Sequence, residues 1–320
     1  MKEAARTLLE GIVDYAGLFP PAELELAPAL ENYLAYRRGS ASWMLGRFVC
    51  PVGRLDALGR ALQGETSAQP VRVSAIPRPL GSMEDLGTQF HSDLIQMHGL
   101  YERTMGRAVV ECVELRLPAM AGSSLESARA AVDAIALQVV ETGTHAEGTG
   151  RPLLELYVEL ALGSALGDAI GFVVEALAGR PGMGFKLRCG GLTPDSVPDS
   201  SVVVHALTAC RDHGVPFKAT AGLHHPIRHR DSSMEVLMHG FLNVFGGGLL
   251  AHEAHLDSVL LHEMIEGQDA ADFEIDDAGF HWRGHTVSPS RIRTMRRWVT
   301  SFGSCSFDEP VEDLRALGWI

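Results

Sequence analysis

The sequence predicts an α/β protein, a (β/α)8 TIM-barrel-like single domain with a C-terminal elaboration. Apolar, β-branched runs alternate with helical patterns, and about seven such runs precede residue 222. This alternation is typical of a parallel sheet covered by helices, and a barrel of ~250 residues fits a chain of 320. An open doubly wound sheet is the alternative, but no GxGxxG motif follows the first predicted strand.

The predicted strands follow one another in chain order, with helical patterns between them. They are 12–15, 42–51, 71–77, 107–118, 152–162, 185–190 and 216–222. The eighth strand has two candidates, FLNVF at 241–245 and SFGSCSF at 301–307. Both segments are short and apolar, so periodicity alone leaves the choice between them open.

We assign residues 1–256 to the barrel and 257–320 to a C-terminal elaboration packed on it. The elaboration supplies either the last strand or a lid. Its patterns predict a helix at 256–267, a hairpin at 273–287 and a helix at 288–301. The Met- and Gly-rich helical stretch at 234–255 is a candidate interface for a homo-oligomer.

Composition narrows the class of protein. The net charge of −13 disfavours a general nucleic-acid binder and an anionic membrane surface. No apolar run approaches the ~20 residues of a membrane span, and the first residues lack a signal peptide's apolar core. The five cysteines are scattered and odd in number, which indicates reduced thiols in a cytoplasmic protein. We therefore expect a small-molecule partner.

Lysine is scarce in this chain. Of the 27 basic residues only three are lysines, Lys2, Lys186 and Lys218, and the others are arginines. Two of the three occupy the same place in consecutive apolar segments, FKLRCGG from Phe185 and FKATAGL from Phe217. A guanidinium stays protonated and is a poor nucleophile, so a lysine kept in such a chain indicates a need for an amine.

The paired segments place these lysines near one site if both belong to a barrel. Side chains alternate across a strand, so Lys186 shares a face with Arg188, and Lys218 with Thr220. Three cations in a partly dry site repel one another, which predicts a lysine pKa lowered toward roughly 7 to 8. A neutral amine of this kind attacks a carbonyl to form a carbinolamine and then a Schiff base.

The motifs FKLRCGG and VPFKATAG resemble those of the deoxyribose-phosphate aldolase group of class I aldolases. That group reads roughly Lys-Thr-Ser-Thr-Gly and Val-Lys-Ala-Ser-Gly-Gly on strands six and seven. The resemblance implies that Lys186 forms the Schiff base and Lys218 tunes it, with Asp14 and Glu114 as proton-handling carboxylates. Separately, DYAGLFPPA and SFGSCSFDEP resemble segments of an uncharacterised bacterial protein family, which implies no function.

Carboxylates on apolar strands complete the candidate catalytic set. Buried carboxylates are costly unless paired, so Glu114 and Glu159 mark the polar end of the barrel. For Glu155 we favour a structural ion pair with an arginine. The alternative for the lysines is equally structural, with each ion-paired to Glu114 or Glu159. The residues assigned to catalysis are Lys186, Lys218, Glu114, Glu159 and Asp14.

Substrate binding falls to residues at the predicted strand ends. Arg188 suits a carboxylate or another anion on the substrate, and the SFGSCSFDEP segment could offer backbone N–H groups to an anion or form a lid. Cys305 lacks a basic residue close in sequence, which argues against a nucleophilic role. The residues assigned to substrate binding are Arg188, Thr220, His224, His225 and Ser304.

Histidines cluster late in the chain, with ten of the 14 between 213 and 285. GLHHPIRH places His224 and His225 directly after the strand of Lys218. They are either ordinary loop histidines, a general acid or base, or ligands of a divalent transition metal together with Glu159.

Three functions follow from these patterns. The first is a lysine-dependent lyase or aldolase, or an enzyme of related carbonyl chemistry, acting without a cofactor on a small anionic substrate. The second is a metal-dependent hydrolase or oxygenase that uses His224, His225 and a carboxylate. The third is a non-catalytic barrel that binds a small anion.

Overall fold

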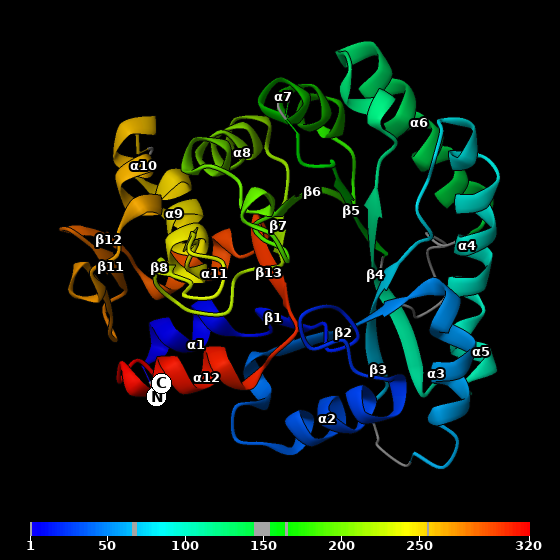
Figure 1. Cartoon of the computed structure of the whole chain (residues 1–320), viewed down its shortest axis with the longest axis horizontal. Helices are drawn as coiled ribbons and strands as arrows, with labels where there is room; N and C mark the ends of the chain where they lie inside the picture. Colours follow the sequence, from blue (N-terminus) through cyan, green and yellow to red (C-terminus); the bar gives the residue numbers. More distant parts are fainter. Residues whose placement is uncertain (1, 66–68, 144–153, 164–165, 255) are drawn as a thin grey trace.

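The computed structural model describes residues 2–65, 69–143, 154–163, 166–254 and 256–320. Eight parallel strands close into a barrel, which confirms the predicted TIM-barrel-like class (Figure 1). In chain order the barrel strands are β1 (Val13–Tyr15), β2 (Leu45–Pro51), β3 (Val71–Ile76), β4 (Ala108–Arg116), β5 (Glu155–Glu159), β6 (Met183–Arg188), β7 (Phe217–Thr220) and β13 (Val299–Ser304). Each strand pairs with its predecessor, and β13 closes the ring between β7 and β1.

Helices surround the barrel (Figure 1). They are α1 (Glu3–Leu9), α2 (Leu26–Arg38), α3 (Leu55–Ala61), α4 (Gln89–His98), α5 (Leu100–Arg103), α6 (Leu125–Glu141), α7 (Leu166–Leu177), α8 (Ser200–His213), α9 (Phe241–Glu253), α10 (Ser258–Glu266), α11 (Pro289–Met295) and α12 (Asp308–Ala316). The two ends of the chain lie together, where Lys2 Nζ donates to the Gly318 carbonyl oxygen at 2.9 Å.

Short 3-10 turns and two small sheets complete the fold. The turns are η1 (Ser42–Met44), η2 (Val52–Arg54), η3 (Glu84–Leu86), η4 (Ala119–Gly122), η5 (Pro194–Ser196) and η6 (Ala270–Asp272). The strands outside the barrel are β8 (His229–Arg230), β9 (Leu237–Met238), β10 (Phe273–Ile275), β11 (Phe280–Trp282) and β12 (His285–Val287). The last three form an antiparallel sheet where the hairpin at 273–287 is predicted.

The repeated Phe-Lys pair reflects the two faces of a barrel strand. Phe185 and Phe217 are buried in the apolar layer between strands and helices, where the Phe217 ring lies 6.3 Å from that of Phe245 in α9. Side chains alternate along a strand, so Lys186 and Lys218 point to the opposite face, into the barrel. In each Phe-Lys pair, the phenylalanine therefore packs against the helices and the lysine lies inside the barrel.

The eighth barrel strand is β13, which contains part of SFGSCSF, whereas FLNVF lies in α9. The helix expected at 288–301 ends at Met295, because Val299–Ser304 pairs in parallel with β1 and β7 instead. The last barrel strand therefore comes from the region 257–320. The strand expected at 152–162 is shorter, since β5 spans Glu155–Glu159, and residues 152 and 153 lie outside the described residues.

Most of α9 is not available as the predicted oligomer interface, and a homo-oligomer itself stays a prediction. Every residue from Phe241 to Ala251 is buried within the chain itself. Glycine makes this close packing possible, because a Cβ on Gly246 would lie 2.3 Å from a ring carbon of Phe280. The apolar character of the segment is used in the core of one chain.

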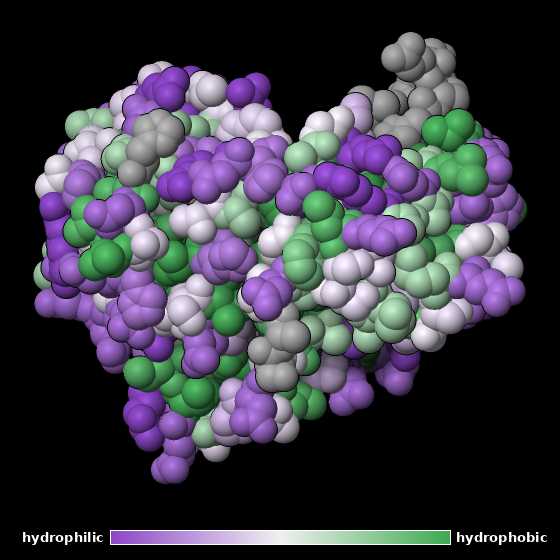
Figure 2. All heavy atoms as spheres, turned by 90° about the horizontal axis from the view of Figure 1, so that it is seen from above, coloured by the Kyte–Doolittle hydropathy of each residue, from purple (hydrophilic) through white to green (hydrophobic). Residues whose placement is uncertain are grey.

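The outer surface is mixed in character. On the face seen from above, apolar residues lie in small groups among hydrophilic ones (Figure 2). Within the described residues, no helix has both the length and the apolar character needed to cross a membrane.

Gly184 tests the packing inside the barrel. A Cβ there would lie 2.5 Å from the Tyr157 ring and 2.7 Å from the Pro216 backbone oxygen, which cannot move freely. We expect Gly184→Ala to lower the free energy of unfolding by ~1–3 kcal/mol in urea titrations. Gly53→Ala is the control, since nothing lies within 4 Å of the place that its added methyl group would occupy. Equal stability of the two variants would contradict the packing described.

Candidate active site

A network of five charged side chains fills the middle of the barrel. All are buried, and they come from five strands: Asp14 from β1, Glu114 from β4, Glu159 from β5, Lys186 from β6 and Lys218 from β7. Strand register brings them together, because Lys186 lies opposite both Glu159 on β5 and Lys218 on β7. The structure thus gathers all five residues predicted as catalytic.

Lys186 is held between two carboxylates. Its Nζ lies 2.8 Å from Glu114 Oε2 and 2.7 Å from Glu159 Oε2. The other Glu159 oxygen accepts two hydrogen bonds from the Arg116 guanidinium, at 3.0 and 3.2 Å. Lys186 is therefore the centre of one half of the network.

Lys218 occupies the other half of the network. Its Nζ donates to Asp14 Oδ2 and, at 2.8 Å, to the Ser301 hydroxyl, and it lies 3.5 Å from Glu114 Oε1. Glu114 therefore faces both lysines with different oxygens. Two further groups donate to these carboxylates. Ser74 Oγ donates to Glu114 Oε1 at 2.6 Å, and the backbone N–H of Arg47 donates to Asp14 Oδ1 at 2.6 Å.

The carboxylates decide the protonation of this site. Burial alone would lower the pKa of both lysines. Glu114 and Glu159 outweigh this effect at Lys186 and raise its pKa above the ordinary value. Asp14 and Glu114 do the same at Lys218. Burial opposes the ionised form of Glu114, yet the two ammonium groups lower its pKa to about 2. The expected lowering of the lysine pKa is therefore wrong, because each lysine has an acidic neighbour closer than any cation.

The predicted binding residues divide into two groups. Arg188 bends back to its own loop, where Nε donates to the Gly190 carbonyl oxygen at 2.8 Å. Thr220 lies at the end of β7, with its hydroxyl beside Gly303. By contrast, Ser304 Oγ lies 3.5 Å from His224 Nδ1, so these two residues meet at the barrel mouth.

Glu155 lies at the opposite, N-terminal end of the barrel. It forms an ion pair of 2.9 Å with Arg47, and Arg47 is also 3.4 Å from Glu111. This is the structural ion pair that the sequence favours for Glu155.

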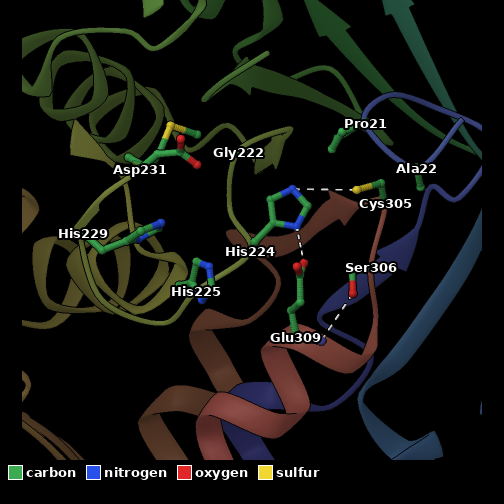
Figure 3. Close-up of a pocket in the computed structure, with 11 residues that line it drawn as sticks. Pro21, Ala22, Gly222, His224, His225, His229, Asp231, Cys305, Ser306 and Glu309 are labelled. Carbon is green, nitrogen blue, oxygen red and sulfur yellow. Dashed lines mark hydrogen bonds and ion pairs between the residues drawn. The ribbon is translucent and has the colours of Figure 1, made fainter. Parts of the chain in front are cut away.

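A cavity of about 380 Å³ opens at the C-terminal ends of the strands (Figure 3). Its walls are segments that follow β1, β7 and β13, which is where active sites of such barrels lie. His224 lies between Cys305 and Glu309, with one ring nitrogen toward each: Nε2 is 3.8 Å from Cys305 Sγ, and Nδ1 is 2.8 Å from Glu309 Oε2. His225 instead pairs with Asp313 at 2.6 Å.

The metal site proposed as an alternative does not form in the part of the chain that the structure describes. There, no three His, Cys, Asp or Glu side chains are arranged to hold an ion. His224 and His225 turn to separate acidic partners on α12, and Glu159 lies inside the barrel with Lys186.

Cys305 and Glu309 are functional candidates that sequence reasoning missed. Cys305 has no base close to it in sequence, but His224, 81 positions away, reaches it in space. The signal was topological: His224 follows β7, Cys305 follows β13, and these strands are neighbours. Placing the last strand correctly would have brought the two together.

Comparison of the chain with protein-family models gives no match, and comparison with curated proteins gives none either. A closed parallel barrel is a common scaffold of enzymes, but the fold does not specify an activity.

Removing the charge of Glu114 tests the network. Glu114→Gln leaves two ammonium groups without their shared carboxylate, and we expect a loss of ~3–5 kcal/mol in the free energy of unfolding at pH 7. Glu155→Gln is the matched control, since its side chain is 42% exposed, and it should lose ~0–1 kcal/mol. Equal losses in urea titrations would contradict the network.

Comparison of the wild type with Glu114→Gln also gives a prediction for the pH dependence of stability. The Glu114 pKa is lowered from 4.5 to about 2 on folding, so its stabilising charge is fully present above pH 4.5 and is lost as pH falls toward 2. The stability difference between wild type and Glu114→Gln should therefore be constant from pH 7 to 5 and shrink below pH 4.5. A difference that stays constant down to pH 2 would show that Glu114 is not paired as described.

Proposed function

We propose that this protein is a carbon–carbon lyase of the aldolase type, in which Lys186 forms a Schiff base with a small carbonyl compound. One observation carries the proposal: Lys186 lies between two carboxylates inside the barrel, beside a second lysine on the next strand. Filling a barrel with such a network is unfavourable compared with apolar side chains, because removing ions from water costs free energy even when they are paired. Catalysis gives a reason for it.

The short distances supply a route for the proton of Lys186. The resting amine is an ammonium, so it must transfer one proton to Glu114 or Glu159, at 2.8 and 2.7 Å, before its nitrogen can attack. The nitrogen then bonds to the carbonyl carbon and a carbinolamine forms. The carboxylic acid returns the proton to the carbinolamine hydroxyl, which leaves as water, and the C=N⁺ bond of the Schiff base remains.

Lys218 has a different role in this scheme. It is fully buried and bound to Asp14 and Ser301, so its Nζ has no free direction toward a substrate. Its charge instead keeps Glu114 ionised and in place beside Lys186, which also makes Glu114 a weaker proton acceptor. Lys218 is a positioning residue, whereas Lys186 is the nucleophile.

Arginines near the strand ends favour an anionic substrate. Arg116 is half exposed while it holds Glu159, and Arg188 lies two residues beyond Lys186 on the same strand face. The Arg116 guanidinium can bind a carboxylate or a similar anion beside the reacting amine, because it shares Glu159 with Lys186. Arg188 would first have to leave the Gly190 carbonyl oxygen. A non-catalytic anion-binding barrel would use the same arginines, but it would tolerate arginine in place of Lys186.

Borohydride trapping tests the proposal. The protein is incubated with small aldehydes and 2-oxo acids, reduced, and digested for peptide mass spectrometry. We expect a secondary-amine adduct on Lys186 with at least one compound, and none on Lys218. Lys186→Arg should lose the adduct, because a guanidinium forms no Schiff base under these conditions.

Lys2→Arg is the matched control, because Lys2 lies near the chain terminus, away from the barrel, and bonds to Gly318. This variant should keep the full adduct yield. Labelling confined to Lys2 or the terminal amine, or no adduct across the panel, would contradict a Schiff-base function.

A further inference from the structure

The barrel mouth holds a second reactive group, distinct in its residues from the lysine network. Cys305 follows β13, His224 lies on the loop after β7, and Glu309 is in the first turn of α12 (Figure 3). All three line the cavity of about 380 Å³. Of the five cysteines, all of which the structure describes, Cys305 alone is not fully buried.

The hydrogen bond to Glu309 sets the orientation and the tautomer of His224. Its Nδ1 lies 2.8 Å from Glu309 Oε2, and a carboxylate accepts, so the Nδ1 position carries the proton. The lone pair of the neutral ring is then on Nε2, which faces Cys305 Sγ at 3.8 Å, within reach of an S–H···N bond. A nucleophile, a base and a residue that orients the base thus contact one another in that order.

We propose that Cys305 and His224 form a second catalytic site, with Glu309 as its positioning residue, which takes the acyl group of a small ester or thioester. The cavity has room for a small acyl donor, and the loop of Pro21 and Ala22 forms one side of it. Ala22 lines the cavity together with Cys305, and its backbone favours the ionised form of the sulfur.

The reaction needs only these groups and one water molecule. His224 Nε2 takes the proton of Cys305 while Sγ bonds to the acyl carbon. The bond between that carbon and the leaving oxygen or sulfur breaks, and the leaving group takes the proton from Nε2 and departs as an alcohol or thiol. Water, deprotonated by His224, then attacks the acyl-cysteine, which releases a carboxylic acid and restores the thiol.

His224 acts as a base during the attack. Burial raises the pKa of the Cys305 thiol and outweighs the Ala22 N–H, which lowers it, and the negative charge of Glu309 raises it further. Cys305 therefore keeps its proton at neutral pH until a substrate is bound, and a preformed thiolate–imidazolium pair is not expected. A mobile proton of this kind makes the rate depend strongly on His224.

Acylation by p-nitrophenyl acetate tests the site. We expect a burst of one p-nitrophenolate per chain and an acetyl group on Cys305, located by peptide mass spectrometry. Cys305→Ala should lose both. A burst that persists in Cys305→Ala, or acetyl groups found only on lysines or on other cysteines, would overturn the proposal.

The role of His224 is tested by matched histidine variants. His224→Ala should slow the burst about 100-fold, because a general base contributes 10² or more to the rate. His262→Ala is the control: His262 also lies beside a glutamate, Glu266 at 3.7 Å, but on the surface of α10. Equal rates in the two variants, with unchanged thermal unfolding, would overturn the assignment of the base.

Glu309 is tested by rescue. Glu309→Gln should slow the burst about tenfold, since the amide can donate to Nδ1 and release the ring from its tautomer, and Glu309→Asp should recover part of the rate. A merely structural role would make both variants alike. Acetyl-Cys305 and a reduced Lys186 adduct are different products on different peptides. The test of the cysteine site is therefore independent of the test of the lyase proposal.

Discussion

The carboxylate of Glu114, shared between Lys186 and Lys218, is the interaction on which the barrel interior depends. It lies 2.8 Å from one ammonium and 3.5 Å from the other, and Ser74 completes its hydrogen bonds. Asp14 and Glu159 extend the network to β1 and β5. Without this shared anion, two buried cations would face each other across adjacent strands, an arrangement that burial and repulsion both oppose.

The network also separates two kinds of chemistry. Inside the barrel, ion pairs keep the lysines charged, so any amine reaction must begin with a proton transfer to a neighbouring carboxylate. At the mouth, His224 and Cys305 have one acidic partner between them, and the cysteine is neutral at rest. The scaffold therefore carries a charged network in its interior and an uncharged cysteine beside a histidine at its mouth.

Sequence reasoning reached the barrel, the neighbouring strands of Lys186 and Lys218, and their carboxylate partners, because these follow from alternation along and between strands. It failed where long-range pairing decides. The sign of the lysine pKa shift depends on which strands place their carboxylates beside Nζ. The contact of His224 with Cys305 depends on β13. From its length and apolar residues alone, this segment could be either a helix or a strand. In α9, a glycine run that suggested an interface instead admits Phe280.

The scarcity of lysine makes the central claim directly measurable. Protein labelled with ¹³Cε-lysine has only three lysine signals, which Lys2→Arg, Lys186→Arg and Lys218→Arg assign. If Glu114 and its neighbours hold both inner lysines as ammonium ions, the signals of Lys186 and Lys218 should stay at the charged chemical shift through pH 10.5, the ordinary midpoint. A midpoint near neutral pH for either lysine would contradict this account, because it would mean that cation repulsion and burial outweigh the carboxylates.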